Sequence, residues 1–263
     1  MKKKLGFALG AGGTRGIAHI GFLKALEEEG IRPDYIAGSS MGSIIGACYA
    51  KGMSPDEMLE VIKKLTAFDI MDIGFPALNT LGLMRWNKVR RMMSSFLEDC
   101  SFEDLEIPFS CVSVDLKSGR LVEFHEGKVV DAILASSSIP TIFRPVEKDG
   151  MLLVDGAVRC RVPVRQVKQM GADVVVAVDV LGAVSPVEKV PNVISLITRV
   201  YEIMDCAAAD RDRRGSRRFV DLWLTPQMGD VSQYKLKYEP AAYEGGYAAG
   251  KENVEKIRAL LGE

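Results

Sequence analysis

The pentapeptide Gly38–Gly42, which reads Gly-Ser-Ser-Met-Gly, constrains the fold of this chain more than any other feature. It follows Tyr35–Ala37, an apolar run typical of a short buried strand, and precedes Ile44–Ala50, whose small and apolar residues are typical of a packed helix. A strand, a G-x-S-x-G turn and a helix in this order form a nucleophile elbow, which exposes a serine hydroxyl at a sharp turn. The pattern predicts that Ser40 is a nucleophile; the alternative is a turn in which Ser40 only caps the helix.

Apolar runs and helical patterns alternate along most of the chain, as is typical of parallel strands joined by helices. We therefore expect an α/β fold, with a mostly parallel central sheet covered by helices on both faces, and residues 1–263 forming a single domain. The predicted strands are Leu5–Leu9, Tyr35–Gly38, Phe109–Asp115, Leu121–Phe124, Leu152–Val154, Val174–Asp179 and Leu222–Leu224. The predicted helices are Gly16–Glu29, Ser43–Lys51, Pro55–Leu65, Asn87–Glu98, Val129–Ser136, Val162–Met170, Val193–Arg213 and Ala248–Leu261.

The carboxyl ends of the predicted strands carry the residues most suited to chemistry. Ligands bind at this edge in open α/β sheets. On this assignment the residues at the edge are Gly10, Ser40, Asp115, Asp155 and Asp179.

A glycine-rich loop, Gly10–Gly16, joins the first predicted strand to a helix. It does not match a dinucleotide fingerprint, because Arg15 stands where the third glycine is required, and no Gly-Lys-Ser/Thr of a phosphate loop follows. Acyl transfer from a serine instead needs amide donors for the developing oxyanion, each contributing about 3–4 kcal/mol. The N–H groups of Gly12 and Gly13 suit this role, since glycine lets the backbone approach a substrate closely. The alternative is a simple tight turn.

Ser40 needs a base to accept its proton, and the chain has only two histidines. His19 lies within the first predicted helix and His125 lies at a polar hairpin end, so we expect structural roles for both. The serine–acid–histidine order of α/β-hydrolases requires a histidine late in the chain, and none follows His125.

Aspartates at strand ends are the remaining candidates for the base. Asp155 is followed at once by Gly156, which lets the backbone turn and leaves the carboxylate facing a neighbouring strand end. An aspartate is a weak base, so burial near Ser40 must raise its pKa. Asp115 and Asp179 stay open as further candidates, with turn formation as their ordinary role.

Three motifs in this order resemble the patatin-like phospholipase family. They are Gly12–Gly16 after a first strand, Gly38–Gly42 about a helix later, and Asp155–Ala157. Ala135–Pro140 and Phe143–Val146 are similar to the stretch that precedes the family's aspartate strand. The resemblance extends from about Leu5 to about Met228.

The resemblance implies a serine–aspartate dyad, with Ser40 as the nucleophile and Asp155 as the base. It also implies an oxyanion hole from the backbone N–H groups of Gly12, Gly13 and Arg15, and lipid acyl-ester hydrolysis without a metal or a cofactor. Besides the oxyanion-hole glycines Gly12 and Gly13, the glycines in or next to these motifs are Gly10, Gly16, Gly38, Gly42 and Gly156. One departure is Ala11, which stands where the family often has a further glycine.

Two other functions use the same residues. A thioesterase or acyltransferase differs from an esterase only in its leaving group and acceptor. A lipid-binding regulatory protein on the same fold would have no turnover, although Ser40 and Asp155 are both intact in this chain.

Composition bears on the partners and the compartment. The net charge is −1, with 34 basic and 35 acidic residues, so the chain has no overall field that attracts nucleic acid. The five cysteines are scattered and form no C-x-x-C pair, which favours a reducing cytoplasm. No apolar run approaches the length of a membrane-spanning helix.

Two segments suggest weak peripheral contact with a membrane, which for a cytoplasmic protein is the inner membrane face. Phe68–Trp86 is rich in large apolar residues without clear periodicity, which suggests an apolar loop over a substrate pocket that also contacts a membrane. Arg211–Arg218 is the densest basic stretch. The alternatives are irregular structure packed on the core for the first and a solvated helix end for the second. The sequence does not predict the oligomeric state.

Overall fold

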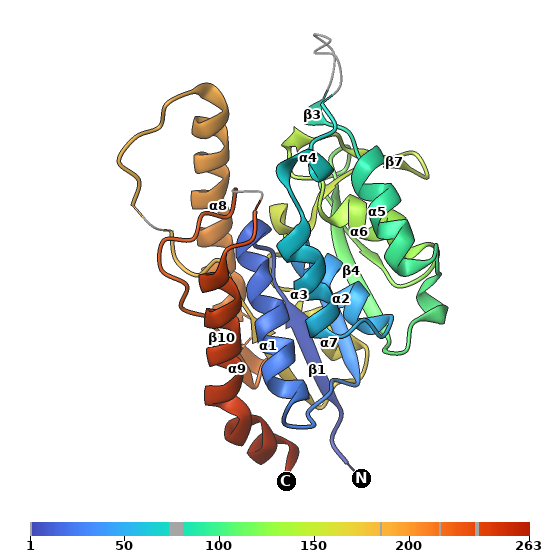
Figure 1. Cartoon of the computed structure of the whole chain (residues 1–263), viewed down its shortest axis with the longest axis vertical. Helices are drawn as coiled ribbons and strands as arrows, with labels where there is room; N and C mark the ends of the chain where they lie inside the picture. The colour runs from blue at the N-terminus through green and yellow to red at the C-terminus, as the bar shows by residue number, and fades with distance from the viewer. Residues whose placement is uncertain (1, 74–80, 185, 216, 235–236) are drawn as a thin grey trace.

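The computed structural model describes residues 2–73, 81–184, 186–215, 217–234 and 237–263. Its central sheet has the strand order β10-β9-β1-β2-β4-β8-β7, with β5 also paired to β4 (Figure 1). The strands of this sheet are β1 (Leu5–Leu9), β2 (Tyr35–Ser39), β4 (Phe109–Asp115), β5 (Leu121–Phe124), β7 (Val146–Lys148), β8 (Met151–Asp155), β9 (Val174–Val178) and β10 (Leu222–Leu224). A second, small sheet pairs β3 (Gly82–Met84) with β6 (Thr141–Phe143).

Helices cover both faces of the central sheet, and the expected α/β fold is confirmed. They are α1 (Ile17–Glu27), α2 (Met41–Ala50), α3 (Pro55–Lys64), α4 (Ala67–Ile70), α5 (Asn87–Leu97), α6 (Val129–Ser136), α7 (Val164–Gln169), α8 (Val193–Gly215) and α9 (Pro240–Leu261). Side chains alternate across the pleat of β1, so Phe7 joins the larger core beneath α1, α2 and α9, whereas Ala8 packs toward α7. Small residues on the second face let α7 pack close to the sheet.

The pairing of β4 brings two strand ends together. Val112 pairs with Ser39 of β2 and with Glu123 of β5, so β2 and β5 lie on opposite edges of β4. Ser113 pairs with Asp155 of β8 and again with β5, so β8 shares the edge that β2 occupies. Because β8 is antiparallel to β4 and β2 is parallel to it, β2 and β8 meet end to end on one edge.

Several short elements and the start of one helix differ from the sequence prediction. The sequence pattern predicts no strand at β3, β6 or β7 and no helix at α4, all of which are only three or four residues long. It predicts a last helix from Ala248, whereas α9 begins at Pro240. Glycines in the first turns of α9 lower helix propensity, but they allow close packing, since a Cβ at Gly246 would lie 1.8 Å from the Ala18 carbonyl oxygen of α1.

Two apolar surfaces lie at the end of the molecule that carries α4, β3 and the start of α8 (Figure 1). In the Phe68–Trp86 segment, Phe68 is 78% exposed and Leu81 is 63% exposed, while residues 74–80 lie outside the described part. Along α8, an apolar stripe is exposed at helical spacing; it consists of Val193, Leu196, Val200 and Met204. Across the described ranges, no helix is both long and apolar enough to cross a membrane.

Candidate active site

Ser40 stands at the junction of β2 and α2 with an unusual backbone conformation. Its φ is 52° and its ψ is −126°, a region that residues other than glycine rarely adopt. A Cβ at Gly38 would lie 2.4 Å from Ser43 Cα, and one at Gly42 would lie 2.2 Å from the Leu9 carbonyl oxygen. Glycine at these two positions therefore permits the sharp turn.

The backbone conformation of Ser40 leads to a prediction about stability. We expect the Ser40→Gly variant to be more stable than Ser40→Ala by about 1 kcal/mol or more, because only glycine adopts this φ without strain. Both variants lose the hydroxyl, so their difference isolates the backbone. Equilibrium urea unfolding measures it, and equal stabilities would show that the turn is not strained.

The hydroxyl of Ser40 reaches the carboxylate of Asp155 where β2 and β8 meet. Ser40 Oγ donates to Asp155 Oδ2 at 2.6 Å, and the Ala157 amide donates to Asp155 Oδ1 at 2.8 Å. The Asp155 amide donates to the Ser138 carbonyl oxygen at 2.9 Å. Ser40 is only 4% exposed and Asp155 only 2% exposed, so this contact is largely shielded from water.

Burial raises the pKa of Asp155 to about 7, although its hydrogen bonds from Ser40 and the Ala157 amide lower it. The negative charge of Asp205 on α8 adds a smaller upward effect on the same pKa. An aspartate with a pKa near 7 can accept a proton from a hydroxyl far better than an exposed one. The arrangement therefore has the geometry and the basicity that a serine–aspartate pair needs.

The glycine loop lies beside Ser40, and Gly13 and Thr14 line the same cavity as the serine. The amides of Gly10 and Ala11 donate to the carbonyl oxygens of Val178 and Arg161, at 2.9 and 3.0 Å. Within the described ranges, the amides of Gly12 and Gly13 donate to no backbone carbonyl, and Gly13 lines the cavity beside Ser40.

Arg15 does not fit the expected oxyanion hole. Its amide donates to the Gly12 carbonyl oxygen at 3.0 Å, because residues Gly13–Gly16 form a short 3-10 helix. Its guanidinium donates to the carbonyl oxygens of Val180 and Val231 at 2.8 and 3.2 Å. Arg15 thus connects the glycine loop to two later loops.

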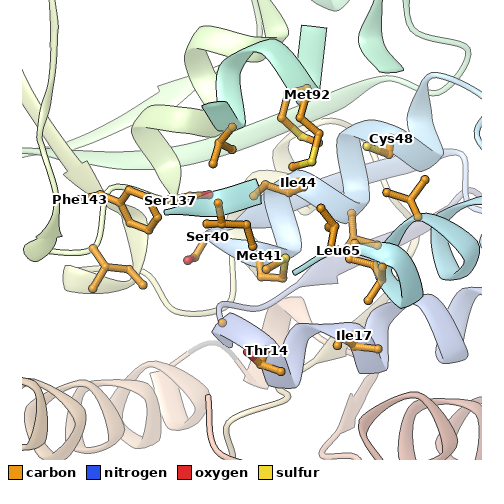
Figure 2. A pocket seen from close by; sticks show the side chains of 18 of the residues that line it. Thr14, Ile17, Ser40, Met41, Ile44, Cys48, Leu65, Met92, Ser137 and Phe143 are labelled. Atoms are coloured by element: carbon orange, nitrogen blue, oxygen red, sulfur yellow. The ribbon is translucent and has the colours of Figure 1, made fainter. Parts of the chain in front are cut away.

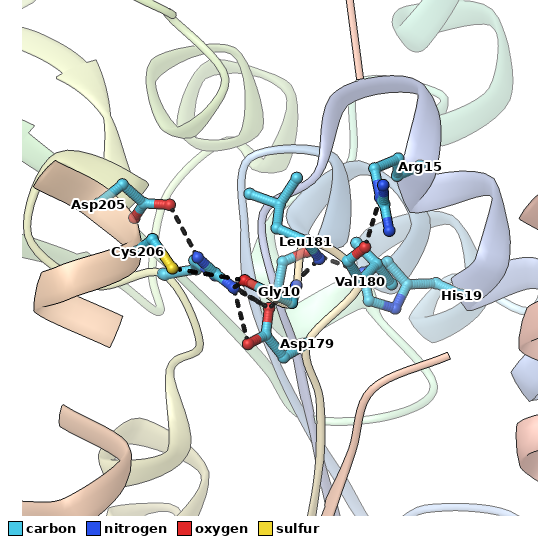
Figure 3. A network of polar contacts seen from close by, with 10 residues as sticks. Gly10, Arg15, His19, Asp179, Val180, Leu181, Asp205 and Cys206 are labelled. Carbon is cyan, nitrogen blue, oxygen red and sulfur yellow. Dashed lines mark hydrogen bonds and ion pairs between the residues drawn. The ribbon is translucent and has the colours of Figure 1, made fainter. Parts of the chain in front are cut away.

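A buried ionic network around Arg161 contacts the glycine loop at Ala11 (Figure 3). The Arg161 guanidinium donates to both oxygens of Asp179, at 2.9 and 2.8 Å, and to Asp205 at 3.2 Å. The Arg161 carbonyl oxygen accepts the Ala11 amide, so the network and the loop are joined through one residue. Asp179 is therefore occupied as a partner of Arg161 rather than of Ser40.

Asp115, His19 and His125 are likewise occupied or distant from Ser40. Asp115 accepts hydrogen bonds from Ser118 and from the Leu152 amide, which hold its pKa low at about 2. His19 is buried, its Nε2 donates to the Gly10 carbonyl oxygen at 2.8 Å, and burial lowers its pKa to about 4. His125 is exposed beyond the end of β5. Asp155 is thus the candidate base that the fold brings to Ser40.

Neighbouring atoms leave no room for a side chain at the motif glycines. At each of them an added Cβ would lie less than 3.0 Å from a neighbouring atom; the set is Gly10, Gly12, Gly13, Gly16, Gly38, Gly42 and Gly156. For Gly156 the neighbour is the Val112 carbonyl oxygen of β4, at 2.4 Å. Glycine at this position lets the chain after Asp155 lie against β4.

An apolar cavity of about 270 Å³ extends from Ser40 between α2, α3 and α5. Figure 2 shows Ser40 at one end of α2 and Cys48 toward the other, with Ile44 between them. The wall is almost entirely aliphatic, aromatic or thioether, and six methionines contribute to it: Met41, Met53, Met58, Met84, Met92 and Met93. Such a wall suits a flexible hydrocarbon chain.

The sequence analysis missed two parts of this site. Ser136 Oγ accepts the Ser40 amide at 3.0 Å and so holds the turn, and the three consecutive serines at Ser136–Ser138 were the signal for such a contact. The methionines of α3 and α5 have the helical spacing of ordinary core residues, which gives no sign of a cavity.

The side chains around Ser40 do not form a cluster of metal ligands. In the part of the chain that the structure describes, no group of three or more His, Cys, Asp or Glu side chains is arranged to hold a metal ion.

Comparisons with known proteins agree with the fold and with the family resemblance. A family model described as patatin-like phospholipase matches residues 7–168. An uncharacterized NTE family protein of Mycobacterium tuberculosis is 37% identical over 180 residues, which are 68% of this chain and 50% of that protein. The lysophospholipase nte1 of Aspergillus fumigatus is 28% identical over 285 residues, which are 98% of this chain and 18% of that protein. The chain thus spans about half the length of the mycobacterial relative and less of the fungal one.

Two solved structures have a similar fold. The structure of VipD from Legionella pneumophila aligns with a TM-score of 0.59 at 13% identity, covering 99% of this chain and 67% of that one. The type III effector protein ExoU of Pseudomonas aeruginosa aligns with a TM-score of 0.50 at 15% identity, covering 99% and 54%. At these identities the likeness concerns the fold alone.

Proposed function

Because this chain belongs to the patatin-like phospholipase family, we propose that it is a serine hydrolase that cleaves fatty-acyl esters of phospholipids or lysophospholipids. The observation that carries the proposal is the 2.6 Å hydrogen bond from Ser40 Oγ to Asp155 Oδ2, at one end of an apolar cavity. A nucleophile beside a base and a hydrocarbon-shaped space are what hydrolysis of a fatty-acyl ester requires.

In the first half of the reaction, Asp155 accepts the Ser40 proton as the hydroxyl oxygen attacks the acyl carbonyl carbon. The carbonyl π bond opens onto its oxygen, and the amides of Gly12 and Gly13 stabilise the resulting oxyanion. The oxyanion then collapses, the bond to the alcohol breaks, and Asp155 returns the proton to the leaving alkoxide. An acyl-enzyme on Ser40 remains.

In the second half, Asp155 accepts a proton from a water molecule that attacks the acyl-enzyme carbonyl. The same two amides stabilise the second oxyanion, and its collapse breaks the bond to Ser40 Oγ. Ser40 regains its proton from Asp155, and the fatty acid leaves. One residue pair serves both halves, because each half needs a base first and an acid afterwards.

The lipid nature of the substrate is supported by the cavity and by a relative. The acyl chain of an ester attacked by Ser40 has the aliphatic and thioether wall along α2 beside it. The fungal relative named lysophospholipase is similar across nearly the whole of this chain. We therefore place phospholipids and lysophospholipids ahead of short soluble esters as substrates.

Fatty-acid release from defined lipids tests the proposal directly. The purified chain is incubated with lysophosphatidylcholine, with phosphatidylcholine, and with the p-nitrophenyl esters of butyrate, octanoate and palmitate, and a heat-inactivated sample serves as the blank. We expect release from at least one lysophospholipid or phospholipid. Release from none of these esters above the blank would reject the hydrolase.

Cys48 provides a prediction about acyl-chain length. It lies eight residues beyond Ser40 on α2, about 12 Å along the helix, and lines the far part of the cavity. We expect Cys48→Phe to lower the rate on palmitate esters about tenfold or more, because the ring occupies space that a long chain needs. The rate on the butyrate ester should change less than about twofold, which also controls for folding. Equal losses on both esters would mean that the acyl chain does not run toward Cys48.

A further inference from the structure

A groove between α3, α4 and α5 shares a wall with the cavity. It shares Val61, Leu65, Met92 and Phe96 with the cavity that holds Ser40. Its remaining lining side chains are Lys64, Phe68, Asp69, Lys88 and Arg91. The groove thus has an apolar floor and a rim with three cationic side chains and one acidic one.

Two cations of this rim, Lys64 and Arg91, have no ion-pair partner among the described residues, unlike their neighbours in sequence. Lys63 pairs with Glu60 at 3.0 Å, and Arg90 pairs with Asp131. In contrast, neither Lys64 nor Arg91 lies within ion-pair distance of a carboxylate anywhere in the described ranges. The rim therefore carries positive charge that the described part of the protein does not neutralise.

Lys88 is the third cation, and it lies near Asp69: the Thr66 hydrogen bonds lower the pKa of that carboxyl most, and the charge of Lys88 lowers it further. Lys88 Nζ donates to the Phe68 carbonyl oxygen at 2.7 Å and lies 3.8 Å from the centre of the Phe68 ring, so its charge is held at the rim. Asp69 Oδ2 accepts from the amide and the hydroxyl of Thr66, at 2.9 and 2.7 Å, as the cap of α4. The rim keeps an excess of positive charge, with three cations against one carboxylate.

We propose that this groove binds the headgroup of an anionic phospholipid in a bilayer and so docks the catalytic cavity on a membrane. The proposal rests on the proposed function, because docking on a membrane serves an enzyme whose substrate is a lipid. The residues that would contact the headgroup are nevertheless separate from Ser40 and Asp155. The cations meet the phosphate, and the apolar floor meets the first part of the acyl chains. The shared wall places the docked lipid next to the cavity.

A bilayer fits this end of the molecule better than a soluble phosphate compound does. Phe68 is 78% exposed beside the groove, and Ile73 and Leu83 of the same segment are 65% and 52% exposed. The apolar stripe of α8 lies at the same end of the molecule (Figure 1). Exposed apolar side chains on two separate segments need a broad apolar partner, which a small anion does not supply.

The basic stretch Arg211–Arg218, which the sequence suggests for membrane contact, ends on a different part of the molecule from the groove. Arg217 and Arg218 belong to the 3-10 helix Arg217–Phe219, which precedes β10 and so lies toward the amino ends of the parallel strands. The Arg218 guanidinium lies 4.7 Å from the centre of the Phe219 ring. Ser40 and the groove lie toward the opposite end, so this stretch and Phe68 cannot meet one flat bilayer together. Arg217 and Arg218 therefore serve as a matched control for the loss of two positive charges away from the groove.

Vesicle co-sedimentation tests the proposal on the full chain carrying Ser40→Ala, which prevents hydrolysis of the vesicles. The vesicles contain phosphatidylcholine alone, or phosphatidylcholine and phosphatidylglycerol in equal parts. We expect Lys64→Gln with Arg91→Gln to weaken binding to the anionic vesicles about 30-fold, and Arg217→Gln with Arg218→Gln to weaken it less than about threefold. The charge-preserving pair Lys64→Arg with Arg91→Lys should bind nearly as the parent does.

Three outcomes would overturn the proposal. Equal losses for the two glutamine pairs would mean that overall charge, not the groove, attracts the vesicles. No loss for the groove pair would mean that the headgroup binds elsewhere. Release of the protein from vesicles by inorganic phosphate at constant ionic strength would identify a soluble phosphate compound as the ligand. Hydrolysis of p-nitrophenyl butyrate by the same variants with Ser40 restored is measured separately, so failure of the proposed function is distinguishable from failure of the groove.

Discussion

Asp155→Asn is expected to lower kcat by about 10⁴-fold while the protein stays folded. The amide of asparagine can donate to Ser40 Oγ and accept the Ala157 amide, so both observed contacts of the side chain have replacements. It cannot accept the Ser40 proton, because an amide nitrogen is not a base at neutral pH. Release of p-nitrophenol from a short ester measures the loss. A rate within about tenfold of the parent would assign the base elsewhere.

The pH dependence of the parent gives an independent check on the same residue. Asp155 acts as a base only when it is ionised, and burial raises its pKa to about 7. We therefore expect kcat/KM to rise with pH through about 7 and to level off above it. A profile that is flat from about pH 5 to pH 8 would contradict a buried carboxylate as the base.

Stability should change in the opposite direction from activity. Since the folded state holds the Asp155 proton more tightly than the unfolded state, the parent loses stability as pH rises from about 4 to about 7. The loss is at most about 4 kcal/mol, because each unit of pKa shift corresponds to about 1.4 kcal/mol. Asparagine does not ionise, so Asp155→Asn should melt higher than the parent near pH 8 and much like it near pH 4. Thermal unfolding at the two pH values measures this difference.

Ser40→Ala is expected to abolish labelling by a fluorophosphonate probe and to lower turnover by at least about 10⁴-fold. The probe forms its bond with an activated serine oxygen, and alanine has none. Ser137→Ala is the matched control, because Ser137 lines the same cavity and, among the described residues, its hydroxyl has no hydrogen-bond partner. The control should keep its label. Labelling that persists in Ser40→Ala, or a parent that takes no label, would remove Ser40 from the mechanism.

The long elements and the residues of short motifs could be predicted from sequence, because both depend on a single stretch of chain. The apolar run at Val174–Val178 and the glycines around Ser40 are of this kind. Gly156 favours Asp155 as the base, but local sequence leaves Asp115 and Asp179 open, and the family resemblance implies the pairing of Ser40 with Asp155. The pairing of β4 decides among them, and strand pairing is a property of distant segments.

An apolar pocket at Phe68–Trp86 could be predicted, and Ile70, Met84 and Trp86 line the cavity. The cavity walls on α3 and α5 and the groove could not, because their signals look ordinary in sequence. A methionine on the apolar face of α5 has the same spacing whether it fills a core or lines a space. Lys64 and Arg91 lie on different segments, and nothing in the chain between them indicates that their charges share a rim. The expectation that the Arg15 amide belongs to the oxyanion hole failed for a local reason. That amide donates within a short 3-10 helix that begins at Gly13, whose φ is 51°.

Because β2 and β8 meet end to end beside β4, the contact between Ser40 and Asp155 depends on pairing between segments far apart in sequence. The serine and the carboxylate are 115 residues apart in sequence, and the strands that carry them are joined in the sheet through β4. A polypeptide in which β4 has not paired with both strands therefore lacks the hydrogen bond between Ser40 and Asp155, and under the proposed function it would have no esterase activity.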